Sequence, residues 1–145
     1  MKPFLSSWPF WAILSAGFAA LTAIFGKIGV QDINSDFSTL IRTVVILAVL
    51  ALIVVASGVW QPLASVSRKT YLFLILSGLA TGASWLCYYR ALKIGPASGV
   101  APIDKLSVLL VAVFGVVFLG ERLEVRNWVG IVMIAAGAIL VAARG

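Results

Sequence analysis

The amino-acid sequence predicts an all-α membrane protein with five transmembrane helices. Hydrophobic residues make up 62% of its 145 residues and charged residues only 11%, and the mean hydropathy is +1.12. A soluble domain of this length has no core large enough to bury so much apolar surface. A helix that crosses a bilayer needs about 20 mostly apolar residues. Each of five stretches without a charged residue therefore predicts one span, namely 3–26, 43–67, 70–89, 106–120 and 127–143.

The first predicted span covers residues 9–28. Lys2 precedes an apolar stretch, as in a secretory signal peptide. The stretch continues to Gly26, however, which makes it longer than the apolar region of a typical signal peptide, and it has no convincing cleavage motif of small residues. We therefore count it as a transmembrane helix.

Short connections separate the other four spans, which we place at 37–59, 70–92, 98–120 and 125–143. The residues just before the second span, 34–36, are Asn, Ser and Asp, which are good helix-capping residues. Gly95 and Pro96 break the chain before the fourth span, and a tight hairpin joins the last two. The spans predict a single transmembrane domain over the whole chain, 1–145, with no room for an extramembrane domain.

Charge and composition exclude several functional classes. The chain has 11 Lys and Arg against 5 Asp and Glu, for a net charge of +6. These basic residues are scattered along the chain, with only Arg68 and Lys69 adjacent, which is typical of membrane-protein loops and not of a nucleic-acid site. With no His and a single Cys, Cys87, a disulfide within the chain is excluded and a His or Cys metal site is not expected. Asp104 is the only carboxylate well inside a span, so a catalytic acid–base pair is missing. We expect no enzyme activity and no cofactor.

Basic residues are nearly balanced between the two faces that five spans create. One face carries the N-terminus with Lys2, Arg68, Lys69, Arg122 and Arg126. The other carries the C-terminus with Lys27, Arg90, Lys93 and Arg144, and Arg42 is a fifth if it lies at the interface. An excess of Lys and Arg normally sets which face stays inside. The near balance therefore predicts dual orientation and an antiparallel homodimer, the two-chain equivalent of an inverted repeat. A fixed orientation with the N-terminus inside is the alternative.

Asp104 and Lys105 lie where charges are costly. In a span over 98–120, Asp104 is about 9 Å from the nearer end at 1.5 Å per residue. A charged side chain that faces lipid costs up to about 3 kcal/mol. Adjacent residues on a helix point about 100° apart, so we expect that these two side chains do not simply neutralise each other. At least one of them then needs a partner on another helix, and the cations Lys27, Arg42 and Arg90 lie at the same membrane face.

The backbone before this charged pair indicates a polar cavity. Gly95, Pro96 and Gly99 precede the pair, and Pro102 has no amide hydrogen to donate to the carbonyl of Ser98. Irregular backbone at membrane depth is tolerated only where it is buried in protein or lines water. We expect the cavity to bind the substrate or the coupling ion through Asp104, Lys105, Arg42, Arg90, Lys27, Trp85 and Tyr88.

Simpler roles for these residues stay open. Lys105 and Arg42 could extend their charged ends to the membrane surface. Asp104 could serve only as a structural counter-ion, and Trp85 and Tyr88 could belong to the aromatic belts found at membrane interfaces.

Several stretches resemble the EamA-like family of the drug/metabolite transporter superfamily. Phe118-Leu-Gly-Glu-Arg-Leu123 is similar to the family's hairpin signature, and Trp128-Val-Gly is similar to the start of its last helix. Arg42 stands where many members have an arginine. The resemblance implies one five-helix module, which is half of the usual inverted repeat of ten helices, and export of metabolites without ATP, often against protons. The chain departs from the pattern at Asp104 and Lys105, where most members are apolar.

We therefore expect a secondary transporter, an exporter of a small metabolite, that works as an antiparallel homodimer in the bacterial inner membrane. Its partners would be lipid and a small substrate, and not nucleic acid. Because the charges inside the spans sum to positive, we expect Lys105 and Arg42 to hold an anionic group. Asp104 either exchanges a proton and couples transport to proton antiport, or stays ionised as a counter-ion. The alternative function is a non-transporting helical subunit that stabilises or regulates a larger membrane complex.

Overall fold

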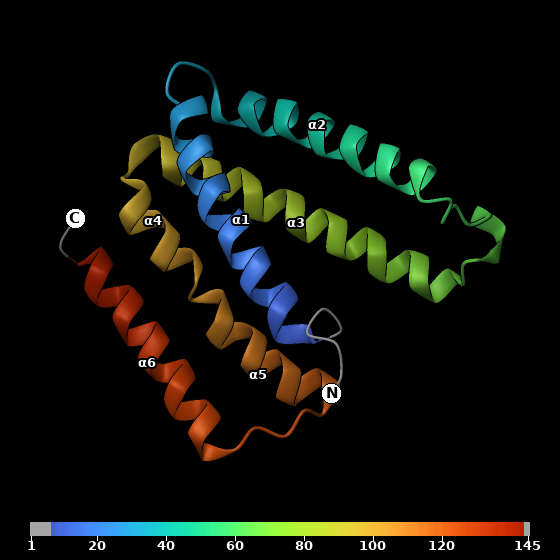
Figure 1. Ribbon diagram of the computed structural model, residues 1–145. Helices are drawn as coiled ribbons and strands as arrows, with labels where there is room; N and C mark the ends of the chain where they lie inside the picture. The colour runs from blue at the N-terminus through green and yellow to red at the C-terminus, as the bar shows by residue number, and fades with distance from the viewer. Residues whose placement is uncertain (1–6, 144–145) are drawn as a thin grey trace. The chain divides into compact units, whose positions relative to one another are not determined.

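The computed structural model describes residues 7–143, and every regular element in this part of the chain is a helix. Five helical segments are long and apolar enough to cross a membrane. The predicted fold class, an all-α protein with five transmembrane helices, is therefore confirmed. Lys2 and Arg144, which the charge balance counts, lie outside the described residues. The elements in chain order are α1 (Trp8–Gly29), α2 (Ser35–Ala56), a single 3-10 turn η2 (Leu63–Ser65), α3 (Arg68–Ile94), α4 (Ala97–Asp104), α5 (Ser107–Leu119) and α6 (Val125–Ala142) (Figure 1).

Capping by Asn34 determines where α2 begins. The side-chain oxygen of Asn34 accepts hydrogen bonds from the amides of Asp36 (2.8 Å) and Phe37 (3.3 Å). These amides belong to the first turn, whose donors have no partner within the helix. The helix therefore starts at Ser35, earlier than the predicted residue 37. Asp36 adds a negative charge in the first turn, which the helix dipole favours.

A similar cap starts α3, and a proline follows its end. The hydroxyl of Ser67 accepts a hydrogen bond from the amide of Thr70 (3.1 Å), and the helix starts at Arg68. It ends at Ile94, just before Gly95 and Pro96, because proline disfavours helical backbone at the residue that precedes it.

The fourth span is interrupted between α4 and α5. The sequence predicts one span over 98–120 with irregular backbone near Pro102. In the structure α4 ends at Asp104 and α5 starts at Ser107. The amide of Lys105 donates to the carbonyl of Pro102, three residues back, at 3.0 Å, which is the pattern of a tighter 3-10 turn. Pro102 lies inside α4 and weakens the regular ladder because it has no amide hydrogen.

The described chain forms two compact units. The first unit contains α1 up to Lys27 together with α4, α5 and α6, and within it α6 packs against both α4 and α5 and runs antiparallel to them (Figure 1). The buried residues of α5 and α6 are Ala112, Gly115 and Ala138. Such small residues allow helix backbones to approach closely, which matters where lipid provides no hydrophobic drive for helix association. The second unit contains α2 and α3.

The end of α5 gives a test of the hairpin that joins it to α6. Gly120 has a φ of 67°, in the left-handed region, and the amide of Glu121 donates to the carbonyl of Gly115 (3.1 Å). Side chains other than glycine meet a steric penalty in this conformation. We expect Gly120→Ala to lower the free energy of unfolding by about 1 kcal/mol, measured by SDS titration of mixed micelles.

The matched control is Gly137→Ala in the middle of α6. A methyl group added there meets nothing within 4 Å, and alanine has the higher helix propensity. This variant should therefore be as stable as the wild type or slightly more stable. Equal losses in the two variants would contradict the role given to Gly120.

Candidate functional site

The interruption of the fourth span carries two opposite charges. Asp104 is the last residue of α4, and Lys105 follows it. Asp104 lies about 10 Å along the span from Ala97, at 1.5 Å per residue. Nζ of Lys105 is 3.2 Å from Oδ2 of Asp104, and the two side chains are 54% and 36% exposed. The pair is therefore not sealed inside this chain.

This contact corrects the expectation that Asp104 and Lys105 do not simply neutralise each other. That expectation assumed a regular helix through both residues. Because α4 ends at Asp104, Lys105 lies in the tighter turn that follows. Its long, flexible side chain can then turn back to the neighbouring carboxylate.

The ends of α4 and α5 add partial charges at the interruption between them. The C-terminus of a helix carries a partial negative charge and the N-terminus a partial positive charge. Lys105 is the C-cap residue of α4, where a cation is favoured. Asp104 lies just before α5, whose N-cap residue Leu106 offers no side-chain hydrogen bond. Discontinuous helices whose ends face polar groups form substrate and ion sites in several transporter folds.

In the second unit, Arg42 of α2 lies against two aromatic rings of α3. Cζ of Arg42 is 3.5 Å from the ring centroid of Trp85 and 5.3 Å from that of Tyr89. Both distances are within the range of cation–π contacts. Nη1 of Arg42 is buried and has no hydrogen-bond partner among the described residues.

Tyr89 is a contact of Arg42 that the sequence argument missed. It named Trp85 and Tyr88 as candidates, and the ring of Tyr88 packs edge-on against that of Tyr89 (6.3 Å between centroids). Residues four apart lie one above the other on a helix. The four-residue spacing of Trp85 and Tyr89 was therefore the signal that could have identified the second ring.

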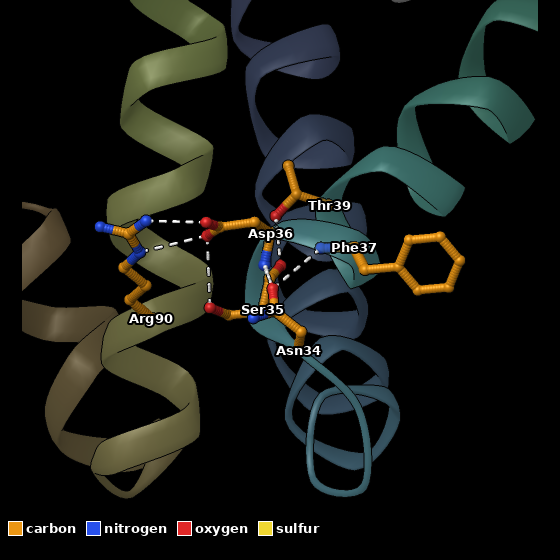
Figure 2. A network of polar contacts seen from close by, with 6 residues as sticks. All are labelled: Asn34, Ser35, Asp36, Phe37, Thr39 and Arg90. Atoms are coloured by element: carbon orange, nitrogen blue, oxygen red, sulfur yellow. Dashed lines mark hydrogen bonds and ion pairs between the residues drawn. The ribbon is translucent and has the colours of Figure 1, made fainter.

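Arg90 is held by Asp36, a residue that the sequence argument treated only as a capping candidate. Nε and Nη2 of Arg90 donate to Oδ1 (3.1 Å) and Oδ2 (2.7 Å) of Asp36 (Figure 2). This two-point contact joins the end of α3 to the start of α2. The preceding charge-free stretch, 70–89, is long enough to cross the roughly 30 Å hydrocarbon core at 1.5 Å per residue. Arg90 therefore belongs at the membrane boundary.

Other lysines bind loop carbonyls. Nζ of Lys27, in the last turn of α1, donates to the carbonyl of Gly95 (2.9 Å). Nζ of Lys93, in the last turn of α3, donates to the carbonyl of Ile33. Cys87 is exposed, and residues 7–143 contain no group of three or more His, Cys, Asp or Glu residues that could hold a metal ion.

The candidate residues thus fall into two sets. Asp104, Lys105 and Lys27 belong to the first unit, and Arg42, Arg90, Trp85 and Tyr88 to the second. Within each unit the contacts described above are formed. A single cavity lined by both sets stays a prediction.

Comparison with known proteins gives the family context. The family model of EamA-like transporters matches residues 6–143. A relative from a Sinorhizobium species, named as an uncharacterized transporter in the cobO 3′ region, is 65% identical over 94% of this chain and 96% of its own length. The Bacillus subtilis protein YxxF, also named as an uncharacterized transporter, is 28% identical over 92% of this chain, which spans only 42% of that relative.

A third relative has a more specific name. It is the probable 4-amino-4-deoxy-L-arabinose-phosphoundecaprenol flippase subunit ArnE of Proteus mirabilis. It is 32% identical over 51% of this chain and 66% of its own length. No solved structure matches the chain significantly.

Proposed function

Because the chain belongs to the EamA-like transporter family, and is accordingly a multi-pass membrane protein with five spans, we propose that it is a secondary transporter that exports a small metabolite. It works without ATP, in the bacterial inner membrane, and carries out no catalytic step. Substrate and coupling ion meet the chain at Asp104, Lys105 and Arg42. Lys27, Arg90, Trp85 and Tyr88 are the further candidate contacts of the substrate or the coupling ion. Lys27 also binds the carbonyl of Gly95 in the α3–α4 connection, and Arg90 also binds Asp36 at the start of α2.

The interruption of the fourth span is the observation that carries this proposal. Non-helical backbone inside a bilayer is stable only where protein or water satisfies its polar groups. Here the irregular turn coincides with Asp104 and Lys105, two charges that remain partly exposed. The coincidence of the two features about 10 Å from the start of the span supports a binding site at this point.

The transporter works as an antiparallel homodimer under this proposal. The YxxF relative is more than twice as long as the part that this chain matches. Two copies of this chain in opposite orientation would supply the second half of an inverted repeat. The near balance of basic residues between the two faces allows both orientations.

A second candidate function is favoured by one comparison. The ArnE relative is named as a subunit of a flippase. By analogy, this chain would act as a non-transporting helical subunit that stabilises or regulates a larger membrane complex. The two candidates differ in whether the purified chain alone is sufficient for transport.

Reconstitution separates the two candidates. Liposomes that contain only the purified protein are loaded with a labelled mixture of acetate, pyruvate, glutamate, lysine and putrescine. The transporter proposal expects efflux of at least one compound that protein-free liposomes retain. Retention of every compound, together with co-purification of a stoichiometric membrane partner, would favour the subunit instead.

Coupling to protons is tested by Asp104→Asn, which keeps the size of the side chain and replaces its carboxyl group with an amide. A pH gradient of one unit is worth about 1.4 kcal/mol per coupled proton, or up to about tenfold in the steady-state substrate ratio. We expect the wild type to show this response and the variant to lose it. Asp32→Asn, at an exposed loop acid, is the control and should respond like the wild type. An unchanged response of Asp104→Asn would make Asp104 a structural counter-ion.

A further inference from the structure

Arg42 differs from four other cations of the chain in its hydrogen bonding. Lys27, Lys93 and Lys105 each donate to an oxygen, and Arg90 donates to two. Among the residues of 7–143 that are not exposed, Nη1 of Arg42 is the one buried side-chain nitrogen or oxygen without a hydrogen-bond partner. A buried donor on a charged group is costly to leave unpaired. An acceptor is therefore expected at this point when the protein functions.

The rings beside Arg42 leave the donors of its guanidinium available. At 3.5 Å from the centroid of Trp85, the cation is stabilised through the ring face, which is a cation–π contact. Such a contact does not consume N–H groups, because the donors of a guanidinium lie in its plane. Tyr89, at 5.3 Å and buried, is the second ring beside the cation.

The one carboxylate on a helix of the second unit does not supply the acceptor. Asp36, on the same helix as Arg42, directs both of its oxygens to Arg90. A bound molecule is one source of a matching group. Guanidinium binds planar oxyanions, carboxylates and phosphates, through two parallel hydrogen bonds.

We propose that Arg42, framed by Trp85 and Tyr89, is the binding site for an oxyanion group. This inference rests on the proposed function, because it takes the oxyanion group to be the anionic end of the transported substrate. It narrows the substrate class to compounds with a carboxylate or phosphate. It also separates Arg42 from Arg90, whose donors are engaged by Asp36.

Binding can be measured without transport. Trp8, Trp11, Trp60 and Trp128 are replaced by Phe, so that Trp85 is the only indole that emits. The purified protein in dodecyl maltoside, which contains no phosphate, is titrated with potassium acetate, succinate and inorganic phosphate at constant ionic strength, with potassium chloride as the reference salt. At least one oxyanion should change the emission of Trp85 in a saturable way, and chloride should not.

Variants decide whether Arg42 is responsible. Arg42→Gln should weaken binding at least tenfold. Arg42→Lys should also weaken it, because an ammonium cannot make the parallel two-point contact. Arg68→Gln, at an exposed cation at the other end of α3, is the matched control and should bind like the background protein. Circular dichroism and gel filtration identify any variant that fails to fold. If Arg42→Gln does not fold, Arg42→Lys is compared with the background protein by the rise in melting temperature that the oxyanion causes.

Three results would overturn the proposal: no saturable change up to about 100 mM, the same change with chloride, or unweakened binding to Arg42→Gln. Lipid is the other source of an oxyanion. Binding that persists in galactolipid nanodiscs but disappears in phosphatidylglycerol nanodiscs would identify a headgroup phosphate as the natural occupant. Because no flux is measured, failure of binding leaves the transporter proposal standing, and failure of transport leaves this site standing.

Discussion

Lys105→Ala is expected to reduce transport about a hundredfold while leaving the amount of protein in the membrane unchanged. Loss of a hydrogen bond to a charged group typically costs about 1.5–3 kcal/mol, and about 2.8 kcal/mol corresponds to a hundredfold change. In this chain the loss would fall on Asp104, whose carboxylate lies 3.2 Å from Nζ of Lys105. It would also remove the cation at the C-terminus of α4, where the helix dipole favours a positive charge. Initial efflux from proteoliposomes, at matched protein density, is the measurement.

Two further variants control for charge and for position. Lys105→Arg keeps the cation and should retain a substantial part of the efflux. Asp32→Ala removes an exposed loop charge without changing the balance of Lys and Arg, and it should transport like the wild type. If Lys105→Ala transported normally, Lys105 would be a residue whose charge only reaches the membrane surface.

A reporter fused to the C-terminus should be found on both sides of the membrane in comparable amounts. With five spans the two termini lie on opposite sides, so each orientation places the reporter differently. The orientation signal is the difference in Lys and Arg between the faces, and here that difference is close to zero. Adding a few basic residues to one face should therefore strongly change the proportion of the two orientations. The measurement is paired activity of a periplasmic reporter and a cytoplasmic reporter on the same fusion.

Opposite additions form the matched pair for this experiment. Gln61→Lys with Ala64→Lys adds charge to the α2–α3 connection and should retain that face inside, which places the C-terminus outside. Gln31→Lys with Asp32→Lys adds charge to the α1–α2 connection and should give the reverse. All four positions are exposed. One fixed orientation in the wild type and in both double variants would rule out dual insertion.

The helices could be predicted from the sequence because they depend on local features. An uninterrupted apolar stretch such as 70–89 specifies a span by length alone, and Asn34 specifies a start by its capping oxygen. Pro102 likewise signalled irregular backbone in the fourth span. The exact position of the break could not be predicted from the sequence, because it depends on which backbone amides donate to the carbonyl three residues back instead of four.

Partners far apart in the sequence were the part that could not be predicted. Asp36 and Arg90 come from different helices, and nothing local to either residue specifies the other. Arg42 could be identified as a costly charge, but its contact with Tyr89 follows from which face of α3 turns toward α2. The pairing of Asp104 with Lys105 was missed for a different reason, because helical geometry was assumed through a point where the helix ends.

The scarcity of large buried side chains has a consequence for how the fold responds to temperature. Leu92 and Val30 are the largest fully buried side chains among the described residues, whereas Leu52 and Phe118 are 69% and 75% exposed. When a soluble protein unfolds, wetting of apolar surface raises the heat capacity by about 12–15 cal/mol/K per residue and curves its stability with temperature. Here, separation of the helices within lipid would exchange contacts with helices for contacts with acyl chains, and little surface would meet water. The heat-capacity change of dissociation should therefore be close to zero, and stability should fall almost linearly on heating, without the maximum at low temperature that soluble domains show.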